Sequence, residues 1–202
     1  MISAAVMAHP RRQPFVRELL DRIGEIPVVW DRTDDEWDTG RRALLAFDPA
    51  ASHHLVIQDD AVPCRDLVVG IDRATTTSGD QPLGLYVGAV SKAPPSFAAL
   101  TSQALEGGKP WFAATGPHWG VAICLPTAHI PELVAAMDAR SDVPNYDARI
   151  AKFYANAGIE CLYPMPSLVD HRPGPSLYPH RSGDRRAHRF IGADTSALDV
   201  DW

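Results

Sequence analysis

The chain has 202 residues, of which 46% are hydrophobic and 22% charged, a balance typical of one globular domain with its own core. The formal net charge of −6 argues against a general nucleic-acid-binding surface. No apolar run approaches the roughly 20 residues of a membrane-spanning helix, the N-terminus lacks the basic region of a signal peptide, and the three cysteines are widely spaced, so we expect a cytoplasmic protein with free thiols.

The first part of the chain alternates apolar runs of strand length with helical patterns. Strands are expected at 2–7, 27–31 and 54–58. The first helix has Pro14 in its first turn and Gly24 after its end, and Thr39 is expected to cap the second. A third helix is expected after Pro63 and a polar loop at 75–82.

The second part continues the alternation. Helices are expected at 97–105, from Pro131 and from Ile150 to Ala157, and strands at 83–90, 119–125 and 161–163. This order predicts an α/β fold with a mostly parallel sheet and helices on both faces. Ligands of such sheets bind at the carboxyl ends of the strands.

Two adjacent carboxylates, Asp59 and Asp60, come directly after the third predicted strand. Like charges this close raise each other's pKa, and burial adds to the effect unless a cation is bound. Carboxylates and phosphate oxygens are the usual ligands of Mg²⁺ and Mn²⁺ in nucleotide sites. The alternative interpretation is an exposed acidic turn in which one aspartate caps the next helix.

An apolar strand, an acidic pair and then Pro63 resemble the metal-binding DxD segment of GT-A glycosyltransferases, especially lipooligosaccharide-type family 25 enzymes and small phage-encoded glycosyltransferases. The segments 116–126, 145–147 and 163–171 extend the similarity in order along the chain. Gln58 departs from the pattern, because the family often has an acid there. The resemblance implies a single GT-A (Rossmann-like) domain at 1–170, with an arginine-rich segment at 171–202 that closes over the donor.

The resemblance also implies roles for the residues at the strand ends. It assigns the metal, Mn²⁺ or Mg²⁺, to Asp60 and His171, and the nucleotide-sugar donor, with a UDP-sugar favoured, to Ala8, His9, Pro10, Asp31 and Asp59. Arg41 and the tail arginines Arg172, Arg181, Arg185, Arg186 and Arg189 are candidates for the phosphates. Simpler interpretations stay open: a solvated loop histidine, a turn aspartate and a solubilising tail.

The reaction implied is sugar transfer to a hydroxyl of a protein or glycan, with inversion, in the host cytoplasm if the enzyme is phage-encoded. Asp147 is the candidate general base, with Asp142 in reserve, although an aspartate in a first helical turn is also stabilised by the helix dipole. Trp111 and Trp119 are candidates for stacking on an acceptor sugar, and core packing is the common alternative.

Two other function classes fit the same pattern less well. A nucleotidyltransferase would use a strand-end aspartate and a metal, but it would have a glycine-rich loop where this chain has 9–14. A non-catalytic nucleotide- or carbohydrate-binding module would keep the fold and the tryptophans without turning over a donor.

Overall fold

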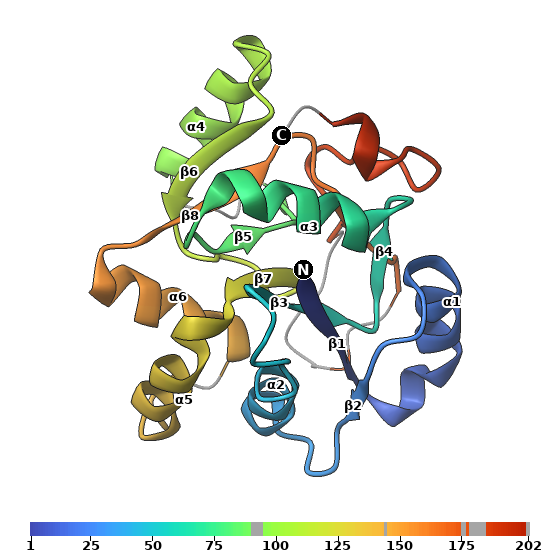
Figure 1. Ribbon diagram of the computed structural model, residues 1–202, viewed down its shortest axis with the longest axis vertical. Coiled ribbons are helices and arrows are strands. Elements are labelled where there is room, and N and C mark those ends of the chain that lie inside the picture. Colours follow the sequence, from blue (N-terminus) through green and yellow to red (C-terminus); the bar gives the residue numbers. More distant parts are fainter. Residues whose placement is uncertain (90–94, 144, 175–176, 178–184, 201–202) are drawn as a thin grey trace.

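The computed structural model describes residues 1–89, 95–143, 145–174, 177 and 185–200, and it confirms the α/β class (Figure 1). The helices are η1 Pro10–Arg12, α1 Gln13–Ile23, α2 Glu36–Leu44, α3 Leu67–Ser78, α4 Pro95–Glu106, η3 Thr127–His129, α5 Ile130–Asp138, α6 Tyr146–Ala157 and η4 Ala197–Asp199. The strands are β1 Ile2–Ala8, β2 Val28–Trp30, β3 His53–Gln58, β4 Ala61–Pro63, β5 Leu83–Gly84, β6 Trp111–Thr115, β7 Ala122–Pro126, β8 Glu160–Pro164 and β9 Val169–His171.

The main sheet has the strand order β2-β1-β3-β7-β5-β8-β6. β1 pairs in parallel with β2 and β3, and β5 pairs in parallel with β8. β7 lies antiparallel between β3 and β5, and the edge strand β6 is antiparallel to β8. Five strands therefore run in one direction, with β6 and β7 opposed to them.

Side chains on alternate positions of the central strands build a core on each face of the sheet. Leu55 and Ile57 of β3 face a core shared with α1 and α3, whereas Val56 faces a core shared with α2, α5 and α6. In Figure 1, α5 and α6 lie at the lower left and α2 lies beside them at the bottom centre. Because both faces of these strands are buried, successive residues are all apolar, and each strand reads as a continuous apolar run. The two cores also confirm the expected helices on both faces of the sheet.

Several expected boundaries differ in the structure. Asp35, not Thr39, is the N-cap of α2, because its carboxylate accepts the backbone N–H groups of Trp37 at 2.8 Å and Asp38 at 3.2 Å. α3 continues through Ser78, so the first part of the expected 75–82 loop is helical. Only Leu83–Gly84 forms a strand within the described part of 83–90.

The edge strand β6 had no counterpart among the expected strands. It lies at Trp111–Thr115, and it pairs with β8 over its full length. Alternate residues of β6 are buried, as expected for an edge strand. The sequence did not predict this strand because so short an apolar stretch carries only a weak periodic signal.

The C-terminal segment packs against the main body of the protein. β9 pairs with β4 in a separate two-stranded sheet, and Ala197 is fully buried against α3, where it meets Gly70. The expected boundary at 170/171 falls inside β9. Among the described residues, no helix is both long and apolar enough to cross a bilayer.

Candidate functional site

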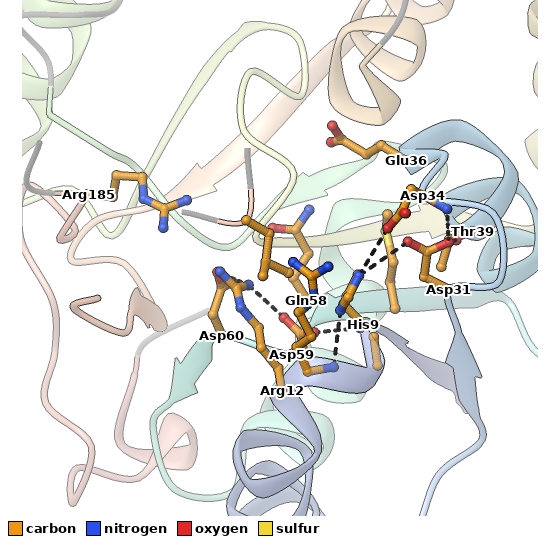
Figure 2. Close-up of a pocket in the computed structure, with 14 residues that line it drawn as sticks. His9, Arg12, Asp31, Asp34, Glu36, Thr39, Gln58, Asp59, Asp60 and Arg185 are labelled. Atoms are coloured by element: carbon orange, nitrogen blue, oxygen red, sulfur yellow. Dashed lines mark hydrogen bonds and ion pairs between the residues drawn. The ribbon is translucent and has the colours of Figure 1, made fainter. Parts of the chain in front are cut away.

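A pocket of about 350 Å³ opens at the carboxyl ends of β1 and β3 (Figure 2). From β1 the chain crosses to β2 on one side and then returns to β3 on the other, so this edge is a topological switch point of the sheet. Ligands of open α/β sheets bind at such points. The lining consists of Met7, Ala8, His9, Arg11, Arg12, Asp31, Asp34, Glu36, Thr39, Gln58, Asp59, Asp60, Leu177 and Arg185.

The acidic pair is buried and is bridged by one arginine. The Asp59 and Asp60 side chains are each only 5% exposed. Nη1 of Arg12 donates to Asp59 Oδ1 at 2.9 Å and also to Asp60 Oδ2, and the backbone N–H of His9 donates to Asp59 Oδ2 at 2.7 Å. The pair is therefore not an exposed acidic turn, and Arg12 supplies its nearest full positive charge.

Two polar atoms beside this bridge lack a hydrogen-bond partner within the described part of the chain: Asp60 Oδ1 and His171 Nε2. His171 Nε2 lies 3.1 Å from Asp60 Oδ2, which makes an ion pair when the imidazole is protonated. The Nδ1–H of His171 donates to the carbonyl oxygen of Arg172 at 2.7 Å, so Nε2 is the ring nitrogen that faces Asp60. A backbone carbonyl on the far nitrogen is the usual support of a metal-ligating histidine, so these residues fit a divalent cation.

The two carboxyl groups differ in acidity. Burial raises the pKa of Asp59 above its ordinary value, and the hydrogen bonds from His9 and Arg12 only partly oppose this. Burial also acts on Asp60, but His171, Arg12 and Arg185 outweigh it and hold its pKa below the ordinary value. Because a metal ligand must be deprotonated, Asp60 is the better ligand of the two.

A second polar cluster lies at the other end of the pocket. His9 Nε2 is 3.3 Å from Asp34 Oδ1 and 3.9 Å from Asp31 Oδ2. These three residues have ligand atoms close enough together to hold an ion. However, His9 Nδ1 accepts the N–H of Arg11 at 3.1 Å, so in neutral His9 the proton is on Nε2, which faces the carboxylates as a donor.

Asp31 is shaped by the turn that follows β2. Its Oδ1 accepts the N–H groups of Thr33 and Asp34 and the hydroxyl of Thr39 at 3.0–3.1 Å. Burial would raise the pKa of Asp31, but these bonds and the nearby His9 hold it below the ordinary value. Thr39, the expected cap, instead fixes a carboxylate at the pocket.

Of the tail arginines that the structure describes, Arg185 lines the pocket. The Tyr86 hydroxyl donates to the carbonyl oxygen of Arg185, and Asp170 Oδ1 accepts the N–H of Ala187 at 2.6 Å. The N–H of His188 continues this attachment by donating to the carbonyl oxygen of Val87 at 2.8 Å. Bonds to the backbone of residues 185, 187 and 188 thus hold Arg185 over the acidic end of the pocket, whereas Arg181 lies outside the described residues.

Asp147 lies next to the pocket, in the first turn of α6. Gly120 separates it from Gln58: a Cβ on Gly120 would be 3.2 Å from both Asp147 Cβ and Gln58 Nε2. The charge of Asp147 alone would raise the pKa of the nearby His118. Burial of the imidazole has the larger effect and lowers that pKa below its ordinary value. The reserve base Asp142 is exposed and bound to Arg140 at 2.6 Å.

Two expected phosphate ligands have other partners. Arg41 Nε binds Asp138 of α5 at 2.9 Å, which ties α2 to α5. Arg172 binds Glu18 of α1 at 2.5 Å and lies over the ring of Phe15. Neither side chain lines the pocket, because each reaches the nearest carboxylate of a neighbouring helix.

The two tryptophans and Pro10 also lie outside the pocket lining. Trp111 is in β6, four positions from β3 in the sheet order. Trp119 packs edge-on against Phe97 and Tyr86, with ring centroids 5.1 Å and 6.0 Å away. Trp119 belongs to the segment that passes Gln58. Pro10 is the first residue of η1, and it is not among the residues that line the pocket.

Sequence reasoning missed the most central residue, Arg12. The signal was present, because Arg12 comes soon after the end of β1 at Ala8, Asp60 comes soon after the end of β3 at Gln58, and parallel neighbours end at the same edge. Gln58, Glu36 and Leu177 were missed as lining residues. Neither the protein-family models nor the curated proteins include a match to this chain.

Proposed function

We propose that the chain is a metal-dependent glycosyltransferase that takes a sugar from a nucleoside-diphosphate donor, with a UDP-sugar favoured. The observation that carries the proposal is the pocket at the switch point, which Asp60 lines and behind which His171 contacts Asp60. Asp60 Oδ1 and His171 Nε2 are buried and have no hydrogen-bond partner within the described part of the chain. Arg12 and Arg185 line the same pocket and suit phosphate oxygens. The GT-A resemblance of the sequence agrees with this chemistry.

In the proposed site, Asp60 and His171 hold Mn²⁺ or Mg²⁺. An ion bound by these residues would supply positive charge near the diphosphate leaving group. Asp31 and His9 present an acceptor and a donor to the nucleotide at the far end of the pocket. Arg185, held by Tyr86 and Asp170, binds phosphate oxygens and helps to exclude water from the donor.

The acceptor hydroxyl approaches from the side of Gln58 and Asp147. Asp147 takes the proton of that hydroxyl as the sugar is displaced with inversion. The acceptor is a protein or a glycan, and Trp119 is the tryptophan near enough to this side to contact it. Trp111 lies on the edge strand β6, four positions from β3 in the sheet order, so we assign it no part in this proposal.

The test is a thermal-shift screen of nucleoside diphosphates and nucleotide sugars, each with and without Mn²⁺. A ligand at about 100 times its Kd stabilises the folded state by about 2.7 kcal/mol. We expect one nucleotide to raise the Tm strongly only with the metal. Asp60→Asn should remove this shift, and Asp142→Asn, an exposed carboxylate paired with Arg140, should retain it.

Turnover then separates the function classes. Release of the nucleoside diphosphate from a nucleotide sugar supports a transferase, whereas binding without turnover indicates a binding module. Pyrophosphate formed from a sugar phosphate and a nucleoside triphosphate indicates a nucleotidyltransferase. If no nucleotide changes the Tm in either metal state, the proposal is wrong.

A further inference from the structure

Arg12 provides the positive charge that compensates two buried carboxylates. Its side chain is 13% exposed, and one nitrogen atom, Nη1, contacts both Asp59 and Asp60. Buried carboxylates without a paired cation are strongly unfavourable. The free protein therefore depends on Arg12 to hold this end of the pocket together.

The same carboxylate is required for the cation site. Arg12 Nη1 and His171 Nε2 both face Asp60 Oδ2, and the second oxygen, Oδ1, is unpartnered within the described residues. An ion between Asp60 and His171 would lie close to the guanidinium, and like charges at such distances repel, most strongly where water is scarce. Arg12 and a divalent ion therefore compete for the carboxylate of Asp60, and binding of one weakens binding of the other.

Arg12 also lines the pocket in which the proposed diphosphate would lie. A guanidinium binds phosphate oxygens in a two-point geometry, so the ligand offers Arg12 an alternative anion. Arg12 is the residue before α1, and its long side chain can change partner without movement of the helix.

We propose that Arg12 is an internal counter-cation that competes with a divalent metal for Asp60 and is drawn away by a nucleoside diphosphate. This inference rests on the proposed function, because it concerns the same metal and donor site. It predicts that the free protein binds metal weakly and that metal and nucleotide strengthen each other's binding. By linkage, the metal increases the affinity for the nucleotide by the same factor as the nucleotide increases the affinity for the metal.

The first experiment measures binding of Mn²⁺ alone, without nucleotide, by electron paramagnetic resonance of the free ion. Arg12→Gln should bind Mn²⁺ about tenfold more tightly than the unmodified protein, because the competing charge is gone. Arg17→Gln is the matched control, since Arg17 is an exposed arginine of α1 outside the pocket lining. Adding Asp60→Asn to Arg12→Gln should abolish the gain.

The second experiment measures UDP binding at several Mn²⁺ concentrations by calorimetry. In Arg12→Gln, UDP should bind more weakly at saturating Mn²⁺, and the dependence of its Kd on Mn²⁺ should be smaller. Arg17→Gln should retain the full dependence. Arg12→Lys covers the case in which Arg12→Gln does not fold, because it keeps a positive charge in the site. A lysine reaches less far than an arginine and lacks the planar guanidinium, so its contact with Asp60 should be weaker than that of Arg12 and Mn²⁺ should bind more tightly than in the unmodified protein.

The outcomes separate the two proposals. If Mn²⁺ and UDP bind the unmodified protein together but the folded Arg12 variants bind Mn²⁺ alone no more tightly, the counter-cation role is wrong and the donor site stands. If the unmodified protein and the Arg12 variants all bind neither Mn²⁺ nor UDP, the proposed function itself fails.

Discussion

Gly120 separates Gln58 from Asp147 at the point where the edge of the sheet meets the first turn of α6. A side chain here would be in tight contact with both residues and with the Tyr146 ring at 3.3 Å. The absence of a Cβ thus lets the candidate base approach the pocket. The backbone N–H of Gln58 donates to the carbonyl oxygen of Val121, which fixes the segment on the other side.

The first prediction concerns this spacing. Gly120→Ala should lower sugar transfer about ten- to hundredfold, because displacement of a positioned group by a fraction of an ångström is costly in catalysis. Binding of UDP with Mn²⁺ should remain, since the donor end of the pocket is untouched. Steady-state transfer kinetics, together with calorimetry of UDP, provide the measurement.

Asp147→Asn serves as the reference for this prediction, because it removes the base and leaves Gly120 in place. Both variants should lower kcat far more than they change donor affinity. Equal transfer by Gly120→Ala and the unmodified protein would show that Asp147 does not act at this distance.

At the level of elements, α2 and α6 meet with almost no space between them. Gly40 of α2 lies against the ring of the fully buried Tyr146, and a Cβ on Gly40 would be 2.2 Å from Tyr146 Cδ2. Arg149 of α6 also stacks over Trp37 of α2, 4.6 Å from the ring centroid. Because Asp147 follows Tyr146, this contact between helices sets the position of the candidate base.

The second prediction follows from that contact. In an exposed helix, replacement of glycine by alanine stabilises by about 1 kcal/mol. Gly40→Ala should instead destabilise the protein by about 1–3 kcal/mol, because it overpacks a buried interface. Urea unfolding followed by circular dichroism measures the difference.

A double-mutant cycle isolates the cause. Tyr146→Leu removes the ring, and in that background Gly40→Ala should cost much less than in the unmodified protein. Additive losses in the cycle would place the origin of the destabilisation elsewhere than at the Gly40–Tyr146 contact.

On the scale of the whole molecule, two buried histidines of β3 link folding to pH. His54 is fully buried: its Nε2–H donates to the Ala43 carbonyl oxygen at 2.9 Å, and its Nδ1 accepts from the Ser3 hydroxyl at 2.8 Å. Burial lowers the pKa of His54 below its ordinary value, and also that of the neighbouring His53. The folded state therefore holds these imidazoles neutral.

The third prediction concerns the direction in which stability changes with pH. The unfolded chain takes up protons at these histidines near pH 6.5, before the folded protein does, so stability is full above that pH and falls as the pH drops below it. The Tm should decrease as the pH falls from 7.5 to about 5.5. His54→Gln, which lacks the titrating ring, should show a shallower decrease, and an unchanged pH dependence would exclude His54 as a source.

The sequence by itself determined the α/β class, the helix ends at Gly24 and Gly158, and the acidic pair at the end of β3. These features depend on local patterns: apolar periodicity, residues that tolerate positive φ, and the position of Asp59 and Asp60 relative to one strand. The proposed metal residues Asp60 and His171 were also named from the sequence, and they lie 3.1 Å apart in the fold.

Only the tertiary structure decided which charged residues meet. Arg12 joins the acidic pair across 47 residues of sequence, Arg185 reaches the pocket in place of Arg172, and Arg41 binds Asp138 on another helix. The reversed direction of β7 is likewise decided by its neighbours in the sheet. Partner choice depends on distance after folding, and a long arginine binds the nearest carboxylate whatever its position in the sequence.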